Sequence, residues 1–383
     1  MHKVTHQPES TRNVPALYMS LELGVAKWEL AFGTTPGGAV RRRTLEIKAS
    51  QTVAEKLATL IADAKAAFGL PAAAPVRSCY EAGRDGFWVH RLLATLAVEN
   101  CVVDSSSIEV NRRARQAKTD RLDATRLLRM LMRYWGGEPD LWHVCWVPSV
   151  AEEDARHQTR LIATLTQERT RWRNRIHAAL ILHGVRMTIG LRFPEKLAAV
   201  RDWNGQALPT GVVNRILQCW TQLEQVTTAL RAARRAARRT LRAAQTEATQ
   251  WAARVHELRG VGQDSALRLA HEIVGRGLKN RRQVGALTGL APLPHGSGET
   301  QHDQGISRSG NGHVSGLAVE LAWVWVQWQP DSAITRWYRT RWANGGRRAR
   351  KIGIVAVARK LLIALWRYGA GGTVPTGAKL RTV

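Results

Sequence analysis

The sequence has few cysteines, no signal-like N-terminus and no long uncharged apolar run, and each shortage excludes a class of protein. Its four cysteines lie far apart with no Cys-x-x-Cys pair, so neither a structural zinc site nor a disulfide framework is expected, and the cysteines are interpreted as core thiols in a reducing compartment. The late apolar runs 316–328 and 352–366 contain Glu320 and Arg359-Lys360 and are too short and too charged to span a bilayer. The polar first 15 residues lack the apolar core of a signal peptide. The sequence therefore predicts a soluble, cytoplasmic protein with no membrane segment.

Acidic residues are also scarce relative to basic ones. Lysine and arginine number 57 against 30 aspartate and glutamate residues, which gives a formal charge of +27 at pH 7 and an isoelectric point near 11.2. Such an excess is the electrostatic footprint of a protein that binds nucleic acid. A basic ribosomal or structural protein has the same footprint, so the charge predicts a partner and not an activity.

The order of apolar patterns predicts an α/β domain followed by helical domains. Strand-like runs occur at 17–23, 29–33, 40–47, 76–80 and 100–103, and helical patterns at 53–67 and 88–96. Consecutive strands followed by strand–helix alternation indicate a mixed sheet with helices packed on it. The expected parts are a flexible leader at 1–15, an α/β domain at 16–150, a long helical region at 151–257, a mainly α-helical domain at 258–370 and a disordered tail at 371–383.

Four acidic residues stand where the surrounding pattern makes them informative. Glu22 interrupts an apolar strand, Glu81 ends the run 76–81, and Asp120 and Asp123 open an amphipathic helix. Residues three apart share a helix face, and an acidic first turn is also explained by capping and surface charge. Buried carboxylates are costly unless they are paired or bind a metal. Four of them converging at strand ends and a helix start would suit Mg²⁺ and two-metal phosphoryl chemistry.

Two long helical patterns, 151–183 and about 212–258, flank a Gly- and Pro-containing linker at 186–209. We expect two antiparallel helices, packed on each other or on another subunit. Both carry arginines. Between the apolar positions of the first helix lie Arg169, Arg171, Arg173 and Arg175. On the second, i, i+3, i+4 helical spacing aligns Arg231, Arg234, Arg235, Arg238, Arg239 and Arg242 along one face. Like charges at i, i+4 repel each other, so a stripe of one sign is better explained by a phosphate backbone than by a solvated face.

Two glycine-rich segments follow. The stretch RGVGQDSA, residues 259–266, is either a helix–turn–helix connection or a turn whose amides meet a phosphate. In the stretch 285–316, Ser297 lies between two glycines, with His295, Glu299, His302 and Asp303 nearby. A serine flanked by glycines can approach a phosphodiester closely, but it needs a base or transition-state stabilisation to react. A plain Gly/Ser loop would have the same pattern.

Taken in order, these motifs resemble a known family. They are Glu22 in the first strand, YEAGRDG with Glu81, KTDRLDA with Asp120 and Asp123, QERTRWRNRIHAALILHG, LRGVGQDSA, LTGLAP, GSGETQ, GISRSGN and VAVARKLL. Together they resemble the DEDD transposases of bacterial insertion sequences, the "IS one-ten" and "IS eleven-eleven" groups, over nearly the whole chain.

The resemblance implies a RuvC-like (RNase H-like) N-terminal domain, a coiled-coil segment, and a C-terminal transposase domain in which Ser297 is a nucleophile. It further implies that Glu22, Glu81, Asp120 and Asp123 hold Mg²⁺, that a structured bridge RNA pairs with donor and target DNA, and that the protein acts as a homo-oligomer, a dimer or tetramer. The expected nucleic-acid contacts are the two arginine sets, Arg308 and Asn311. Two features depart from the family pattern: Glu22 stands where aspartate is usual, and the basic cluster after the serine is thin.

The resulting hypothesis is a bacterial DNA transposase that cuts and rejoins strands through a covalent phosphoserine intermediate. One alternative is a metal-dependent nuclease of Holliday-junction type, which needs the four acids but not Ser297. The other is an inactive relic that still binds nucleic acid through its basic surface.

Overall fold

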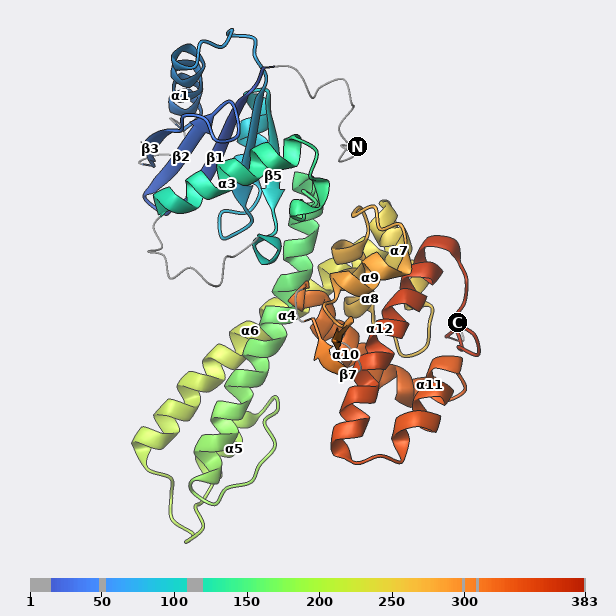
Figure 1. Cartoon of the computed structure of the whole chain (residues 1–383). Coiled ribbons are helices and arrows are strands. Elements are labelled where there is room, and N and C mark those ends of the chain that lie inside the picture. The colour runs from blue at the N-terminus through green and yellow to red at the C-terminus, as the bar shows by residue number, and fades with distance from the viewer. Residues whose placement is uncertain (1–14, 48–52, 109–119, 298–299, 308–309, 382–383) are drawn as a thin grey trace. The chain divides into compact units, whose positions relative to one another are not determined.

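A computed structural model of the protein describes residues 15–47, 53–108, 120–297, 300–307 and 310–381 (Figure 1), with the side chains of 120–121 and 293–304 excepted. The chain forms two compact units, Met1–Pro148 and Ser149–Val383. All but the last residue of the expected leader lies outside the described residues. In the described chain, no helix combines the length and the apolar character needed to cross a membrane.

The first unit is built on a five-stranded mixed sheet, as the sequence predicts. The strands are β1 (Leu17–Leu23), β2 (Lys27–Gly33), β3 (Arg41–Glu46), β4 (Val76–Glu81) and β5 (Val98–Val103). Their order across the sheet is β3-β2-β1-β4-β5. β2 runs antiparallel to both β1 and β3, whereas β4 is parallel to β1 and to β5.

The two faces of this sheet are chemically different. Alternate residues of β1, which are Leu17, Met19 and Leu21, pack with α1 (Val53–Ala67) and α2 (Trp88–Thr95) in one apolar core. The opposite face carries smaller and polar side chains and is covered by α3 (Asp120–Trp135), which lies across the sheet in Figure 1. Because strand side chains alternate between faces, every second residue of β1 and β4 belongs to the α3 face.

The second unit begins with two long antiparallel helices that pack on each other, α4 (Val150–Ile181) and α6 (Thr210–Ala243). A capping box starts α4: Ser149 Oγ accepts from the Glu152 amide at 3.2 Å, and Glu152 Oε2 accepts from the Ser149 amide at 2.8 Å. An apolar cluster that includes Ile176, Phe193 and Ile216 joins the far ends of both helices. Phe193 belongs to the short helix α5 (Phe193–Ala199), which lies inside the stretch expected to be a linker.

The second long helix is shorter than expected. The helical pattern at 212–258 predicts one continuous helix, but α6 ends at Ala243 and α7 (Glu247–His256) follows. Ala244 adopts the left-handed conformation with φ of 42°, which costs a residue with a Cβ roughly 1–2 kcal/mol. Thr246 then caps α7 by accepting from the Thr249 amide. The break lets Leu241 and Trp251 enter the same core.

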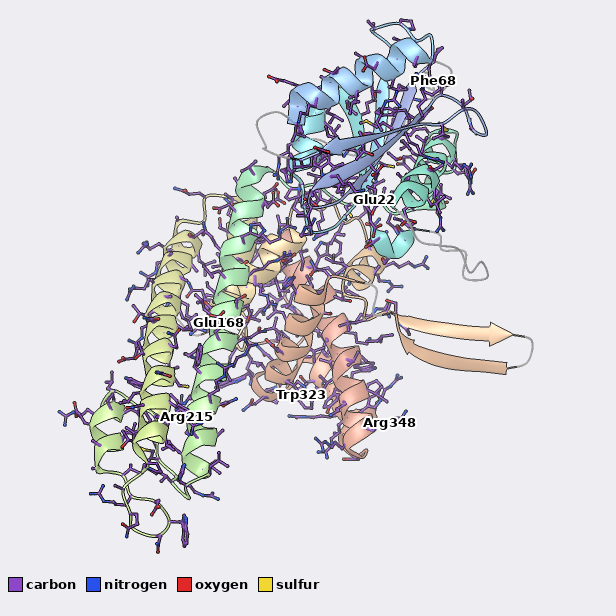
Figure 2. All side chains as sticks on the ribbon, turned by 90° about the vertical axis from the view of Figure 1, so that its left-hand side faces the viewer. Glu22, Phe68, Glu168, Arg215, Trp323 and Arg348 are labelled. Carbon is purple, nitrogen blue, oxygen red and sulfur yellow. The ribbon has the colours of Figure 1, made fainter. Side chains whose placement is uncertain are left out.

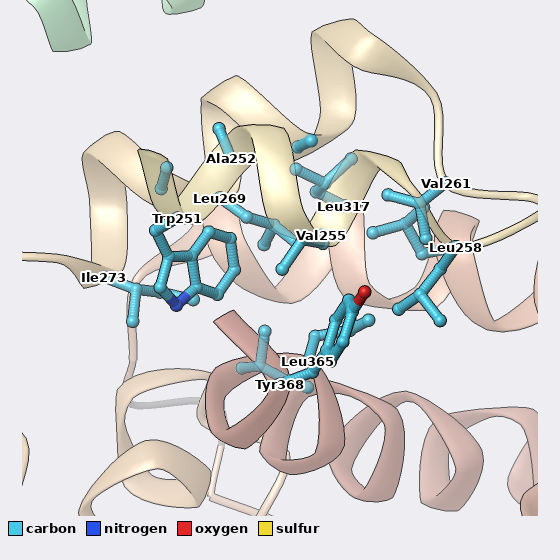
Figure 3. Close-up of a cluster of buried hydrophobic side chains, with 14 of the residues drawn as sticks. Trp251, Ala252, Val255, Leu258, Val261, Leu269, Ile273, Leu317, Leu365 and Tyr368 are labelled. Carbon is cyan, nitrogen blue, oxygen red and sulfur yellow. The ribbon is translucent and has the colours of Figure 1, made fainter. Parts of the chain in front are cut away.

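The remaining helices form the main core of the second unit. They are α8 (Gln263–Ile273), α9 (Arg281–Leu287), α10 (Gly312–Trp328), α11 (Ala333–Tyr338) and α12 (Arg347–Gly371). Figure 3 shows the core between them, where Trp251 and Val255 of α7 face Leu365 and Tyr368 of α12. The Tyr368 hydroxyl donates to Glu257 Oε2 at 2.7 Å, so the polar end of this buried ring is paired.

The segment after α12 is ordered through Arg381, where the sequence predicts a disordered tail at 371–383. The Arg381 amide donates to the Glu257 carbonyl at 2.7 Å, and its guanidinium donates to the carbonyls of His256 and Val261. Gln329 donates through Nε2 to the Lys379 carbonyl and accepts from the Lys379 amide, both at 2.8 Å. These hydrogen bonds hold in place a segment whose composition alone predicts disorder.

Candidate catalytic site and nucleic-acid-binding surfaces

Three acidic side chains occupy neighbouring positions on the α3 face of the sheet. Glu22 and Glu29 are cross-strand partners in the β1–β2 register. The parallel register between β1 and β4 ends with the pair Leu21 and Tyr80, which Glu22 and Glu81 follow directly. Side chains directly opposite each other across a sheet have Cβ atoms roughly 4.5–5.5 Å apart. Three adjacent strands therefore present a row of carboxylates, and Figure 2 labels Glu22 within it.

Helix α3 brings its acidic first turn toward this row. Ser20 Oγ donates to the Ala124 carbonyl at 2.6 Å, and Cys79 Sγ lies 3.8 Å from the Leu127 carbonyl. Ser20 and Cys79 each precede a member of the row by two residues on the same face. The other end of α3 packs near Gly33, where a Cβ would lie 2.8 Å from Met132 Cε. Gly33 pairs with Tyr18 at the start of β1, so α3 runs antiparallel to β1 and begins beside the carboxylates.

The four expected acidic residues are thus brought to one end of one face by strand register and helix direction. Glu81 is exposed, and Glu22 and Asp123 are half-buried. The side chain of Asp120 lies outside the described residues. Among the side chains that are described, no three of the histidine, cysteine and acidic groups are close enough to hold a metal ion. The donors are nevertheless of the right type, because carboxylate oxygens are the ligands that Mg²⁺ prefers.

Glu29 is a member of the row that the sequence patterns missed. Its side chain is 4% exposed and lies 3.4 Å from Lys27 Nζ, and it accepts from Thr44 Oγ1 at 3.0 Å. Its signal was the hairpin itself: once β1 and β2 are recognised as antiparallel around a turn at 24–26, Glu22 and Glu29 must oppose each other. Glu29, Arg42, Arg43 and Thr44 line a depression of about 330 Å³ beside the row.

Ser297 ends one strand of a hairpin that the sequence patterns did not predict. β6 (Pro292–Ser297) pairs antiparallel with β7 (Thr300–Ile306), and Ser297 is opposite Thr300. The Ser297 side chain lies outside the described residues, as do those of the nearby His295, His302 and Asp303; Glu299 and Arg308 lie outside them altogether. Figure 2 shows the hairpin standing away from the helices of its own unit. Ser297 is therefore near the tip of a projection.

The base of this hairpin is fixed to the helical core. The Ser307 amide donates to the Ala291 carbonyl at 3.0 Å, and the Asn311 amide donates to the Leu287 carbonyl at 2.8 Å. Gly289 precedes β6 and Gly310 follows β7. A Cβ at Gly310 would overlap the backbone of Gly289, so only glycine allows the segments entering and leaving the hairpin to approach this closely. A projecting hairpin is held at its base by these contacts.

A buried carboxylate, Glu272 of α8, lies under this base. Its side chain is 1% exposed and 2.7 Å from Arg160 Nη2 of α4. Asn311 Nδ2 donates to Glu272 Oε2 at 2.8 Å, and Arg276 Nη2 lies 3.7 Å from the same oxygen. Burial, and then the charge of Arg160, lowers the pKa of the neighbouring His313. Asn311, expected to bind nucleic acid, here joins the hairpin exit to α4 and α8.

The arginine set of α6 differs from its sequence pattern at one position. Arg234 Nε lies 2.7 Å from Asp264 Oδ2 at the start of α8, which ties α6 to the turn of RGVGQDSA. The other five arginines, Arg231, Arg235, Arg238, Arg239 and Arg242, are exposed. They form what we call the α6 stripe.

The arginine set of α4 borders a surface hollow. Arg171 and Arg175 line an open depression of about 580 Å³, and the Arg175 guanidinium lies 4.4 Å from the Trp172 ring centroid. Arg173 is exposed, and Arg169 is half-buried. Stacking on Trp172 holds Arg175 in one orientation.

Comparisons with known proteins show the family of the chain. The model of the family described as "Transposase IS116/IS110/IS902 family" matches residues 252–338. The protein named "Putative transposase y4rJ" of Sinorhizobium fredii (strain NBRC 101917 / NGR234) is 36% identical over 379 residues, 96% of this chain and 95% of that protein. "Putative transposase y4qE" of the same strain is 27% identical over 328 residues, 75% of this chain and 74% of that protein.

A third relative comes from another organism. The "Transposase for insertion sequence element IS1328" of Yersinia enterocolitica is 27% identical over 226 residues, which cover 57% of this chain and 63% of that protein. Similarity to y4rJ extends over nearly the full length of both proteins. The chain therefore belongs to the IS116/IS110/IS902 family of transposases.

Proposed function

We propose that this transposase is an RNA-guided DNA recombinase that uses the acidic residues of α3 and the sheet together with Ser297. The observation that carries the proposal is the strand register, which sets Glu22 and Glu81 in neighbouring strands with the acidic start of α3 on the same face. The first unit has a mixed five-stranded sheet with acidic residues at strand ends, and this supports a RuvC-like fold for that unit.

In this proposal Glu22, Glu81, Asp120 and Asp123 hold Mg²⁺, which supplies Lewis-acid stabilisation of the phosphoryl group. Ser297 Oγ attacks the phosphorus of a DNA strand. The new oxygen–phosphorus bond forms as the bond to the leaving deoxyribose oxygen breaks, and the serine proton ends on that leaving oxygen. A hydroxyl of another strand reverses the exchange, so the phosphodiester energy is conserved in the phosphoserine.

The remaining parts of the proposal concern partners. A structured bridge RNA would pair with donor and target DNA, and its backbone and that of the DNA would lie on the exposed arginines of α4 and α6. The acids and Ser297 belong to different units of the chain, so the reaction can combine residues of two subunits in a dimer or tetramer. The hairpin that ends at Ser297 stands away from the helices of its own unit (Figure 2), which suits contact with a partner.

A covalent-adduct trap tests the chemistry. The protein is expressed with its native flanking DNA, and DNA-linked protein is recovered under denaturing conditions from wild type, Ser297→Ala and Asp120→Ala. An adduct that requires both residues is the expected result. Cleavage that continues in Ser297→Ala without an adduct would indicate a nuclease that uses water instead. Nucleic-acid binding with neither cleavage nor adduct in wild type would indicate an inactive relic.

The α6 stripe gives a separate prediction. Each phosphate contact contributes roughly 0.9 to the slope of log affinity against log salt for duplex DNA. Arg238→Gln is therefore expected to lower this slope by about 0.9. Arg234→Gln, on the same helix but ion-paired with Asp264, is the matched control and should leave the slope unchanged. Equal slopes in all three proteins would exclude the stripe as a phosphate-binding surface.

A further inference from the structure

A second strongly basic surface lies at the start of α12, far along the chain from the α6 stripe. Its members are all exposed and come from α11, the π-helical turn Arg339–Ala343 and the first turns of α12: Arg336, Arg339, Arg341, Arg347, Arg348, Arg350 and Lys351. We call them the α12 basic surface. Figure 2 labels Arg348 within it.

Few acidic residues balance the positive charge of this surface. No aspartate or glutamate follows Asp331 in the sequence. Asp331 itself lies 2.7 Å from Lys379 Nζ, and its pKa is lowered chiefly by the hydrogen bond from Lys379, with smaller effects of Arg336 and Arg339. The carboxylate of Asp331 is therefore already committed to another cation.

The helix beneath the surface adds to the positive charge. Gly346 is the N-cap of the 25-residue helix α12, no side chain caps it, and its first turn has no acidic residue. The N-terminus of a helix carries a partial positive charge that favours anions. Arg347, Arg348 and Arg350 therefore stand at the end of the helix where cations are unfavourable. An external anion would accept hydrogen bonds from the uncapped amides and reduce the repulsion among the arginines.

Packed aromatic rings hold the surface in shape. Trp337 and Trp342 meet edge to face with their ring centroids 4.7 Å apart, and a Cβ at Gly353 would lie 2.8 Å from Trp342. Lys360 Nζ lies 4.3 Å from the Trp337 centroid, and the Arg341 guanidinium lies 5.7 Å from it. Cation–π contacts of this kind reduce the freedom of the side chains that would meet a ligand.

We propose that the α12 basic surface binds the sugar–phosphate backbone of duplex DNA, with one phosphate at the N-terminus of α12. Duplex DNA is the partner because the protein is a transposase and because closely spaced phosphates match a dense set of cations. Backbone amides at a helix N-terminus are a common phosphate site. The assignment does not depend on the acidic row, on Ser297 or on the α6 stripe.

A pair of variants at Gly346 separates anion binding from folding. A Cβ at Gly346 meets no atom within 4 Å, and the backbone there, with φ of −60° and ψ of 174°, accepts any residue. Asparagine and aspartate are equally good N-caps, so Gly346→Asn and Gly346→Asp should both melt at or slightly above the wild-type temperature. Only aspartate places a negative charge in the proposed phosphate position.

The full-length proteins are titrated with a short duplex DNA over a range of salt concentrations. Gly346→Asp is expected to bind about tenfold more weakly than wild type and to lower the salt slope by about 0.9. Gly346→Asn should bind as wild type does. Equal affinity of Gly346→Asp and wild type, or an equal loss in Gly346→Asn, would overturn the proposal.

A charge-neutralised variant and an RNA arm complete the test. Changing Arg347, Arg348 and Arg350 to glutamine should lower the slope for duplex DNA by roughly 2–3. The control is the loss of three exposed cations near the far end of the long helices, Arg192, Lys196 and Arg201, and the same drop there would show a nonspecific effect of net charge. Loss of binding to single-stranded RNA alone, with duplex binding intact, would overturn DNA as the partner.

Discussion

Asp123→Asn is expected to slow DNA cleavage by about 10³-fold, equivalent to roughly 4 kcal/mol of activation free energy, while DNA binding is retained. Asparagine keeps the size of the side chain and removes the charge that would hold Mg²⁺. Asp123 is half-buried in the first turn of α3, and the adjacent Ala124 carbonyl is already fixed by Ser20. The substitution therefore removes a carboxylate from the acidic end of the sheet without loosening the helix.

The measurement is a single-turnover cleavage rate at saturating protein, with a salt titration of DNA binding in parallel. Asp63→Asn is the matched control, because Asp63 is an exposed residue of α1, on the opposite side of the sheet. We expect the control to cleave at the wild-type rate. A wild-type rate in Asp123→Asn would remove this residue from the proposed metal site.

Glu272→Ala is expected to give the largest loss of stability, about 3 kcal/mol. Removing one partner of a buried ion pair leaves the other charge buried without a counter-charge, which lowers the free energy of unfolding by about 3–5 kcal/mol. The lower end applies because Arg160 remains 30% exposed and Arg276 20% exposed, so both can still reach water. For a unit of this size the change corresponds to a fall of roughly 6–12 °C in melting temperature.

Two further variants identify the cause of that loss. Glu272→Gln keeps an acceptor for Arg160 or Asn311 and should lose less stability than Glu272→Ala. Asp331→Asn breaks an ion pair with Lys379 of equal length, 2.7 Å, but at the surface, where such pairs contribute little. We expect its melting temperature to stay near that of wild type. A similar fall in melting temperature in Asp331→Asn and in Glu272→Ala would argue against burial as the origin of the loss.

The mixed sheet of the first unit could be predicted because its strands carry strong apolar patterns. The run 17–23 matches β1 to the residue, and the helix expected at 53–67 is α1. The pairing between strands was harder to predict, because the residues of a strand do not specify which other strand it pairs with. Glu29 was missed for that reason: its membership of the acidic row depends on the β1–β2 register and not on any local pattern.

In the second unit, the errors come from tertiary contacts that override a local pattern. The arginines and alanines of 231–242 continue smoothly toward Leu258, and nothing in them predicts the left-handed Ala244. The break is favoured because Leu241 and Trp251 both reach the core. Arg234 likewise matches its neighbours in sequence and differs only because Asp264 folds against it. The transposase family, in contrast, followed from the order of motifs along the chain and is confirmed.

The docking of residues 379–381 has a consequence for synthesis. A ribosome releases the chain from the N-terminus, and domains generally fold as they emerge. The first unit, Met1–Pro148, holds all the strands of its sheet and can be completed early. At the connection between α7 and α8, the Arg259 amide donates to the Lys379 carbonyl, and Arg381 donates to the carbonyls of His256, Glu257 and Val261. These bonds can form only near the end of translation. A premature stop after α12 would therefore leave an intact acidic sheet joined to a helical unit that lacks its closing contacts.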